Sequence, residues 1–258
     1  MNIGIIGAGN MGGAIAQGLL SSKQIAPQQL LVADVNAAIL APLAAQGCCT
    51  LNNNSQLVQK ADVVVLAVKP WLVPTVLQEI RSALSVDKIL ISVAAGVTLD
   101  NLQNECGIAL PLFRIIPNTA IAVQQSMSFI SSRNASQAQQ KIVVKLFDSL
   151  GKTLLIAEEQ MAAATALSSC GIAYAMRYVS ANMRAGVEIG FAPTVAKSII
   201  LQTLQGAVSL LQLTDAHPEA EIDRVTTPKG YTIKGLNALE HKGFTSAVVE
   251  AVKASLSL

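Results

Sequence analysis

The sequence predicts an α/β protein with a doubly wound, mostly parallel sheet over residues 1–158 and an all-helical domain over residues 159–258. Short Val- and Ile-rich runs alternate with helical stretches through the first part. That alternation is typical of a parallel sheet with helices on both faces. A glycine-rich loop directly follows the first run, and after residue 158 no such run interrupts the helical pattern.

The expected strands are almost wholly apolar at the start of the chain, as strands covered on both faces must be. They are predicted over residues 2–6, 30–33, 63–67, 89–93, 113–116 and 153–156. Helices are predicted between them over residues 12–21, 37–46, 73–83, 99–106 and 136–150. In the second domain we expect helices over residues 159–185, interrupted near Gly171, over 192–213, and from Pro228 to the end in one or two pieces.

The composition is apolar, with 52% hydrophobic and only 13% charged residues. A membrane span needs about 20 predominantly apolar residues, but the uncharged stretches of the helical part, 160–176 and 198–214, are broken by Ser, Thr and Gln. The start lacks the basic segment of a signal peptide, and the four cysteines have no metal-site spacing. A net charge of +2 without a basic cluster offers nothing to nucleic acid. We expect a reduced, cytoplasmic protein without a metal, membrane or nucleic-acid partner.

The charges are unevenly distributed. Residues 1–60 hold three charged side chains and residues 160–214 hold four. The first deficit fits the buried start of a doubly wound sheet. The second leaves too few charges to cover an isolated helical domain in water, so something must cover that surface.

Gly7-Ala8-Gly9-Asn10-Met11-Gly12 has the pattern GxGxxG, follows a predicted strand and opens a predicted helix. Such glycines allow a tight turn and let backbone N–H groups approach a pyrophosphate. An acidic residue about 20 positions later binds the ribose in this motif, and Asp34 stands there. The first domain is therefore predicted to be of the Rossmann type and to bind a dinucleotide.

Asp34 also bears on the choice of cofactor. A carboxylate accepts hydrogen bonds from the ribose hydroxyls of NADH but repels the 2′-phosphate of NADPH. Asn36 and Asn54 could still accommodate a phosphate, so both cofactors stay open. Further polar or small residues end later strands at 67–70, 92–96 and 114–119, where ligands of open α/β sheets bind.

The segment 226–232, Thr-Thr-Pro-Lys-Gly-Tyr-Thr, is the best candidate site in the helical part. Thr followed by Pro predicts a helix start, with unpaired N–H groups at Lys229, Gly230 and Tyr231 that favour a carboxylate. Thr232 adds a hydroxyl one turn further on. An ordinary capped helix is the alternative.

Groups for acid–base catalysis are scarce in this chain. The two histidines, His217 and His241, lie in polar segments, and no lysine occurs between Lys152 and Lys197. Reduction of a carbonyl needs such a group, whereas a protonated imine carries its own activating charge. The sequence therefore favours an imine substrate.

These motifs together resemble the pyrroline-5-carboxylate reductases, which catalyse the last step of proline biosynthesis. The resemblance covers nearly the whole chain. Its segments are IGAGNMGGAIAQGL at the start, AVKP at 67–70, SVAAGV at 92–97, RIIPNT at 114–119, TALSSCGIAYAM at 165–176 and HPEAEIDRVTTPKGYTIKGLNALEHKGF at 217–244.

The resemblance implies NAD(P)H-dependent reduction of 1-pyrroline-5-carboxylate to L-proline. Thr232 would hydrogen-bond the ring nitrogen as the catalytic residue, while Thr227 and the amides of Gly230, Tyr231 and Thr232 would bind the carboxylate. NADPH or NADH would be held by Gly7, Gly9, Asn10, Met11, Gly12, Asp34, Asn54, Ala67, Lys69, Pro70 and Asn118. It also implies an obligate homodimer or a ring of dimers, whose partner helices cover the apolar surface.

Some positions depart from the family pattern. Lys229 stands where a second glycine is usual, and Ser169, Cys170 and Ile172 replace Gly, Ser and Pro. Many members favour NADPH and lack an acid at the place of Asp34. Two alternatives remain: a 3-hydroxy-acid dehydrogenase, which would need a lysine early in the helical part, and a non-catalytic dinucleotide-binding regulator.

Overall fold

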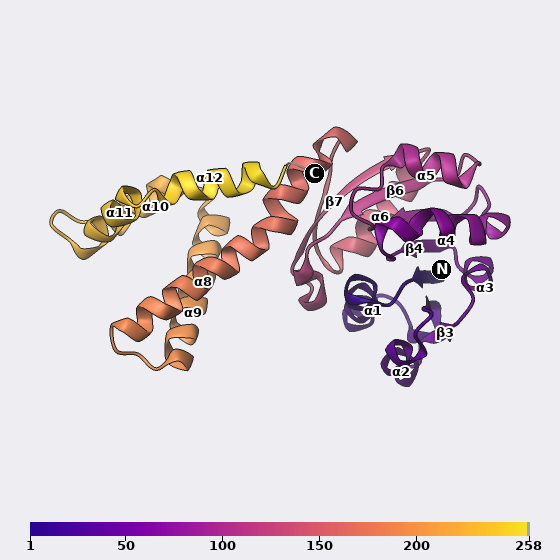
Figure 1. Cartoon of the computed structure of the whole chain (residues 1–258), viewed down its shortest axis with the longest axis horizontal. Coiled ribbons are helices and arrows are strands. Elements are labelled where there is room, and N and C mark those ends of the chain that lie inside the picture. Colours follow the sequence, from indigo (N-terminus) through magenta and orange to yellow (C-terminus); the bar gives the residue numbers. More distant parts are fainter. Residues whose placement is uncertain (257–258) are drawn as a thin grey trace. The chain divides into compact units, whose positions relative to one another are not determined.

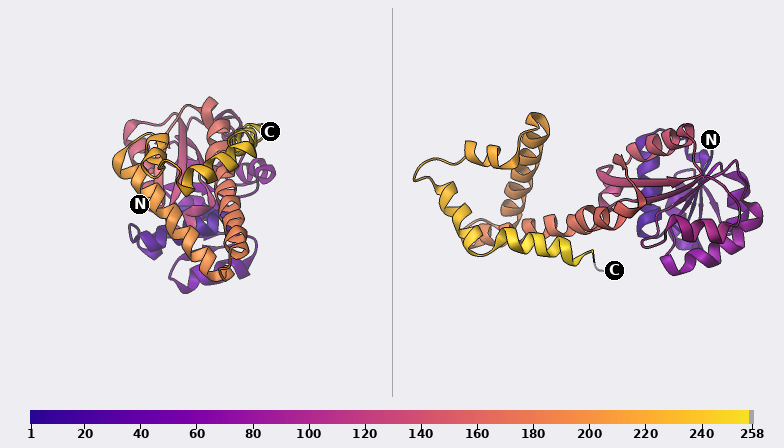
Figure 2. Two further views of the ribbon diagram at one scale, coloured as in Figure 1. Left: turned by 90° about the vertical axis from the view of Figure 1, so that its left-hand side faces the viewer. Right: turned by 90° about the horizontal axis from the view of Figure 1, so that it is seen from above.

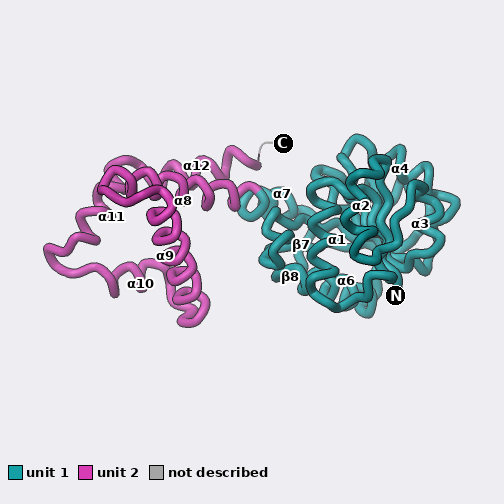
Figure 3. Tube along the Cα trace, turned by 90° about the horizontal axis from the view of Figure 1, so that it is seen from below, with its two compact units in different colours: residues 1–169 teal, residues 170–258 magenta. Residues whose placement is uncertain are grey.

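The structure is a computed structural model that describes residues 1–256 (Figure 1). The chain forms two compact units, Met1–Ser169 and Cys170–Leu258 (Figure 3). Residues 159–169, which the sequence places with the helices, belong to the first unit, where Met161 and Ala164 pack against Ile116 and Phe129 of the sheet.

The first unit is built on an eight-stranded sheet in the order β3-β2-β1-β4-β5-β6-β7-β8. The strands are β1 (Ile3–Ile6), β2 (Leu30–Ala33), β3 (Cys49–Leu51), β4 (Val63–Leu66), β5 (Ile89–Ser92), β6 (Leu112–Ile116), β7 (Ser126–Arg133) and β8 (Gly151–Leu155). Only β6 and β7 pair antiparallel. The strand order reverses between β1 and β4, which creates the crevice where ligands of such sheets bind.

Helices cover both faces of this sheet (Figure 2). They are α1 (Asn10–Ser22), α2 (Ala37–Ala45), α3 (Asn54–Lys60), α4 (Val73–Ile80), α5 (Leu99–Cys106), α6 (Gln137–Asp148) and the short α7 (Met161–Ala164). One core cluster joins Ile3 and Ile5 to α1, α2 and α6, and the other joins Ile6 to α3, α4 and α5. This alternation along β1 is expected because successive side chains of a strand point to opposite faces.

Two strands and two helices were not predicted. β3 has only three residues, and β7 has the sequence Ser-Met-Ser-Phe-Ile-Ser-Ser-Arg, which is too polar to resemble a buried strand. The structure nevertheless buries Ser126 and Ser128, whose hydroxyls lie 3.1 Å apart and hydrogen-bond each other. Helices α3 and α10 (Pro218–Arg224) are short, and both lack an apolar stripe long enough to indicate a helix.

A half-buried ion pair joins β6 to the segment after β8. Arg114 donates to Glu158 at 3.1 Å, and their side chains are only 11% and 20% exposed. The same carboxylate oxygen accepts from the backbone N–H of Leu99 at the start of α5, at 2.7 Å. Glu158 therefore joins three separate parts of the first unit.

The second unit is all helical. It contains α8 (Gly171–Glu188), α9 (Pro193–Thr214), α10, α11 (Tyr231–His241) and α12 (Phe244–Ala254). A π-helical turn at Thr165–Cys170 precedes α8, which is the interruption expected near Gly171. The final stretch from Pro228 holds two helices, but the first begins at Tyr231 rather than at Pro228.

The helices of the second unit pack loosely on one another. An added Cβ at Gly186 would lie 2.7 Å from the Cβ of Ala196, so α8 and α9 cross closely at that point. The hydroxyl of Tyr174 donates to the carbonyl of Ala251 at 3.1 Å, and the rings of Tyr178 and Phe244 meet edge to face at 6.3 Å. These contacts join α8 to α12.

Most apolar side chains of this unit are exposed within the single chain. Ala196 is the one buried residue in the described helices α8 to α12, while Ile189 is 75% and Leu213 is 84% exposed. Of the described helices, α9 alone is long and apolar enough to cross a membrane, by length and composition only. A surface of this kind marks an interaction site.

We predict that Glu158→Ala destabilises the first unit. It removes the partner of the Arg114 guanidinium and of the Leu99 N–H, which should lower the free energy of unfolding by about 2 kcal/mol. The matched control is Glu250→Ala, which breaks an exposed pair with Lys253 and should cost less than about 0.5 kcal/mol. Urea unfolding of both variants tests this, and equal losses would contradict it.

Candidate active site

The glycine-rich loop between β1 and α1 is packed tightly against the end of β4. Gly7 has φ +94°, and its N–H donates to the carbonyl of Ala33 at 2.8 Å. An added Cβ at Gly7 would lie 2.8 Å from the carbonyl oxygen of Ala67, and one at Gly12 would lie 1.9 Å from that of Gly7. Larger residues at these two positions would push the loop apart.

Gly9 differs from these two glycines because it faces open space. It is the N-cap of α1 without a side-chain cap, and an added Cβ would meet no atom within 4 Å. The first N–H groups of a helix have no partner inside it, so those of Asn10 and Met11 are available to an anion. The loop thus fits the pyrophosphate of a dinucleotide, with Gly9 leaving the space that it needs.

Asp34 lies directly after β2 and is bonded into this loop. Its Oδ2 accepts from the backbone N–H of Ala8 at 2.7 Å, and its Oδ1 accepts from that of Asn36 at 2.8 Å. The carboxylate therefore stands beside the loop, as the sequence motif requires.

The other predicted cofactor residues follow strands at the same edge of the sheet. Ala67, Lys69 and Pro70 follow β4, and the Lys69 side chain is exposed. A cavity of about 380 Å³ between Pro70 and residues 95–97 opens beside them. Asn54 opens α3, where its amide donates to Glu79 at 2.8 Å.

Asn118 follows β6 and contacts the π-helical turn. Its Nδ2 donates to the Ser168 hydroxyl at 3.2 Å, while the hydroxyl of Ser169 donates to the carbonyl of Pro117 at 2.6 Å. These serines support the Pro117–Asn118 loop, and sequence reasoning did not assign them that role. No local signal joins residues some fifty positions apart, although π-helical turns often mark functional sites.

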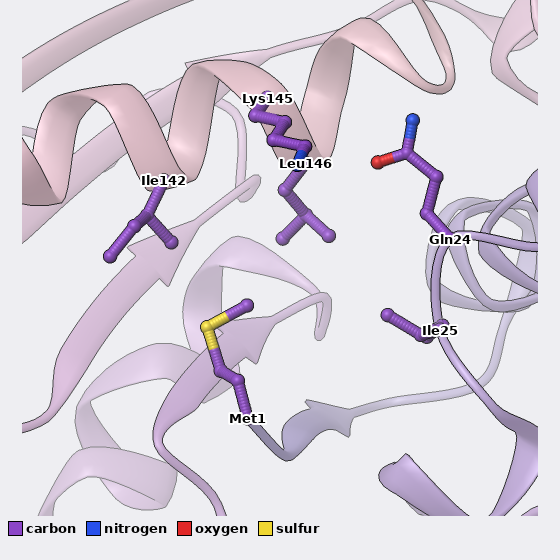
Figure 4. A pocket seen from close by; sticks show the side chains of 6 residues that line it. All are labelled: Met1, Gln24, Ile25, Ile142, Lys145 and Leu146. Atoms are coloured by element: carbon purple, nitrogen blue, oxygen red, sulfur yellow. The ribbon is translucent and has the colours of Figure 1, made fainter.

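A second cavity, of about 500 Å³, lies away from this edge (Figure 4). Met1 enters it just before β1, and Ile142 and Leu146 reach it from α6. The full lining is Met1, Gln24, Ile25, Ile142, Lys145 and Leu146. Because it adjoins the amino end of β1, it takes no part in the cofactor crevice.

In the second unit, residues 227–230 form a turn and not a helix start. The N–H of Gly230 donates to the carbonyl of Thr227 at 2.9 Å, and α11 begins only at Tyr231, with Gly230 as its N-cap. The prediction that Thr227 and Pro228 start the helix is therefore wrong, and the N–H of Gly230 is already bonded. Pro at the second position of a β-turn is as favourable as Pro at a helix start, which explains the error.

The turn explains the glycine at position 230 and the strain at position 229. Lys229 has φ +62°, in the left-handed region that costs a lysine roughly 1 kcal/mol. An added Cβ at Gly230 would lie 2.5 Å from the hydroxyl oxygen of Thr227. The turn therefore holds Thr227 against the backbone at the start of α11.

The start of α11 has uncapped backbone N–H groups. No side chain caps it, so the first N–H groups, including those of Tyr231 and Thr232, remain free to bind a ligand. Thr227 and Thr232 are exposed, and Tyr231 is 93% exposed in this chain. The structure thus brings Thr227, Gly230, Tyr231 and Thr232 together around one helix start.

The two histidines and Cys106 are not among the predicted site residues. His217 caps α10 by accepting from the N–H of Glu219 at 3.3 Å, and His241 is exposed at the end of α11. Burial raises the pKa of Cys106 to about 11, so this thiol stays protonated and unreactive. Within residues 1–256, no three His, Cys, Asp or Glu side chains gather to hold a metal ion.

Comparison with known proteins identifies the family. The family model described as pyrroline-5-carboxylate reductase dimerisation matches residues 158–257, and one described as NADP oxidoreductase, coenzyme F420-dependent, matches residues 2–96. Pyrroline-5-carboxylate reductase 2 of Dictyostelium discoideum is 34% identical over 97% of this chain and 89% of its own length. The chain belongs to the pyrroline-5-carboxylate reductase family.

Other relatives agree in sequence and in fold. Pyrroline-5-carboxylate reductase 1 of the same organism is 36% identical over 98% of this chain, which spans about half (48%) of that relative's length. The crystal structure of Plasmodium falciparum pyrroline carboxylate reductase with NADP bound is 29% identical, with a TM-score of 0.90 over 99% of this chain and 95% of that one. The two-unit architecture is thus that of the pyrroline-5-carboxylate reductases.

The two kinds of glycine in the loop of this reductase lead to a prediction. Gly9→Ala should leave the thermal midpoint unchanged, because its Cβ meets no protein atom, yet weaken NAD(P)H binding by roughly 10-fold or more, because the methyl group occupies the pyrophosphate's space. Gly12→Ala should instead lower both the thermal midpoint and the affinity for NAD(P)H, since its Cβ overlaps the Gly7 carbonyl. Calorimetric cofactor titration and thermal unfolding separate the two, and a Gly9→Ala variant with normal affinity would contradict this assignment.

Proposed function

We propose that the chain reduces 1-pyrroline-5-carboxylate to L-proline with NAD(P)H. The observation that carries this proposal is the uncapped start of α11 behind the Thr227–Gly230 turn, with the Thr232 hydroxyl one residue inside it. This arrangement suits a small ligand with a carboxylate beside a nitrogen. The nucleotide loop of the first unit fits the cofactor.

We assign the binding roles in the second unit as follows. Free N–H groups at the start of α11 and the Thr227 hydroxyl bind the substrate carboxylate, helped by the positive end of the helix dipole. The Thr232 hydroxyl accepts a hydrogen bond from the protonated ring nitrogen and fixes the orientation of the imine plane. The lysine at 229 adds positive charge at the same turn.

The cofactor, when bound, supplies the hydride that reduces the imine carbon. The protonated ring nitrogen of the substrate makes the neighbouring imine carbon electrophilic. The chain therefore does not need a side chain that donates a proton during the step. That fits a site built from backbone amides and hydroxyls. A 3-hydroxy-acid dehydrogenase would need a lysine early in the helical part, and residues 153–196 contain none.

Self-association follows from the apolar surface of the second unit. We propose an obligate homodimer in which the exposed faces of α8 and α9 are covered by the same helices of a partner, with a ring of dimers as a further possibility. The dimerisation family model over residues 158–257 supports this assignment.

The direct test of the function is imine-dependent oxidation of NADH and of NADPH, followed by the loss of absorbance of the reduced cofactor. Turnover with at least one of them is expected. Absence of turnover with both would reject the reductase and would favour a non-catalytic dinucleotide-binding regulator.

Thr232→Ala should lower kcat by roughly 100-fold, because a preorganised hydrogen bond to the reacting group is lost. Cofactor affinity should stay unchanged, since Thr232 belongs to the second unit. Thr232→Ser keeps the hydroxyl and should recover most of the activity. Unchanged kcat in the alanine variant would remove Thr232 from the catalytic role.

The native chain should be a dimer, or a multiple of one, in size-exclusion chromatography with light scattering. Ile199→Asp combined with Leu210→Asp places two charges on one side of α9, three turns apart, and should shift the protein towards monomer. Val86→Asp, at an exposed apolar residue of the first unit, is the matched control and should leave the dimer intact. A native monomer would contradict the proposal.

A further inference from the structure

We propose that this reductase prefers NADH to NADPH and that Asp34 sets the preference. The inference rests on the proposed function, because it concerns the cofactor of the same reaction. It depends on three observations: how the Asp34 carboxylate is held, which charges surround it, and what the neighbouring asparagines do.

The carboxylate of Asp34 is fixed in place by two backbone hydrogen bonds. Oδ2 accepts from Ala8 at 2.7 Å, inside the glycine-rich loop, and Oδ1 accepts from Asn36 at 2.8 Å. A side chain held at both oxygens does not turn away to admit a bulky anion. Each oxygen retains a free lone pair, so the carboxylate can still accept from ribose hydroxyls.

No cation in this stretch of the chain compensates the charge. Asp34 is the only charged residue between Lys23 and Lys60. Lys23 ends α1 and Lys60 ends α3, both at the opposite edge of the sheet from Asp34. A 2′-phosphate beside Asp34 would therefore meet a fixed negative charge with no Lys or Arg of the β2–α2 loop to balance it.

The two asparagines near Asp34 add no positive charge, and each is held by a hydrogen bond within the chain. Asn36 caps α2 by accepting from the N–H of Ala38 at 3.1 Å. The Asn54 amide donates to the carboxylate of Glu79 at 2.8 Å. Neither neutral amide offsets the charge of Asp34, and Asn54 is paired with a second acidic group, Glu79.

Lys69 is a cation at this edge of the sheet, but it stands on the other side of the glycine-rich loop from Asp34. β1 lies between β2 and β4 in the sheet, with Ile6 paired to Ala33 on one side and to Leu66 on the other. Asp34 follows β2 and Lys69 follows β4. The glycine-rich loop, which follows β1, separates the two charges.

The test is calorimetric binding of NAD⁺ and NADP⁺ to the full-length protein, so that the result does not depend on turnover. NAD⁺ should bind at least ~10-fold tighter than NADP⁺. Asp34→Asn keeps the size and one acceptor oxygen, and it should narrow this ratio by ~10-fold or more through tighter NADP⁺ binding. Asp62→Asn removes the same charge at the amino end of β4, where Asp62 accepts from the N–H of Asn2, and should leave the ratio unchanged.

A second variant tests the preference without removing the hydrogen bonds that Asp34 makes to the loop. Val35 is fully exposed, so Val35→Arg adds a cation beside an intact Asp34. It should strengthen NADP⁺ binding by ~10-fold and change NAD⁺ binding by less than ~3-fold.

The proposal is overturned if the native protein binds NADP⁺ as tightly as NAD⁺, or if Val35→Arg changes both affinities alike. If Asp34→Asn weakened the binding of NAD⁺ and of NADP⁺ equally, Asp34 would only support the loop structure. Its role in selecting the cofactor would then be overturned. Failure of the proposed function is distinct: imine turnover would then be absent with either cofactor while the binding ratio persisted.

Discussion

The structure of the second unit is governed by one constraint: its helices cannot bury their apolar side chains within a single chain. In the described part of this unit, five helices leave only Ala196 buried, and α8 and α9 cross closely at Gly186. The remaining apolar surface must be covered by another molecule.

The first unit meets the opposite condition, because its apolar strands are covered on both faces and its core leaves little room for change. Close packing explains why the loop glycines have different roles. Gly7 and Gly12 hold the loop against the end of β4, whereas Gly9 leaves space for a ligand. The shape of the loop at the crevice thus depends on the packing of Gly7 and Gly12, which do not need to contact a ligand.

The sequence was sufficient where burial or a backbone motif dictates the residue. The apolar runs predicted β1, β2, β4, β5 and β6 closely, and the glycine spacing located the cofactor loop. It failed where polar residues are buried through mutual hydrogen bonds, as Ser126 and Ser128 are in β7. It also failed where one dipeptide suits two local structures, as Thr227-Pro228 does. Contacts such as Ser168 with Asn118 depend on tertiary structure alone.

The turn at residues 227–230 shows how a departure from the family pattern is tolerated. Lysine at φ +62° is strained by roughly 1 kcal/mol relative to glycine, yet the turn keeps its hydrogen bond from Gly230 to Thr227. Strain of this kind persists where the surrounding structure determines the backbone, and it concentrates at functional sites. At this turn the cost is accompanied by a positive charge beside the uncapped start of α11. A substrate that carries both a carboxylate and a protonated nitrogen needs little more than that from the chain, because the charge that activates it is its own.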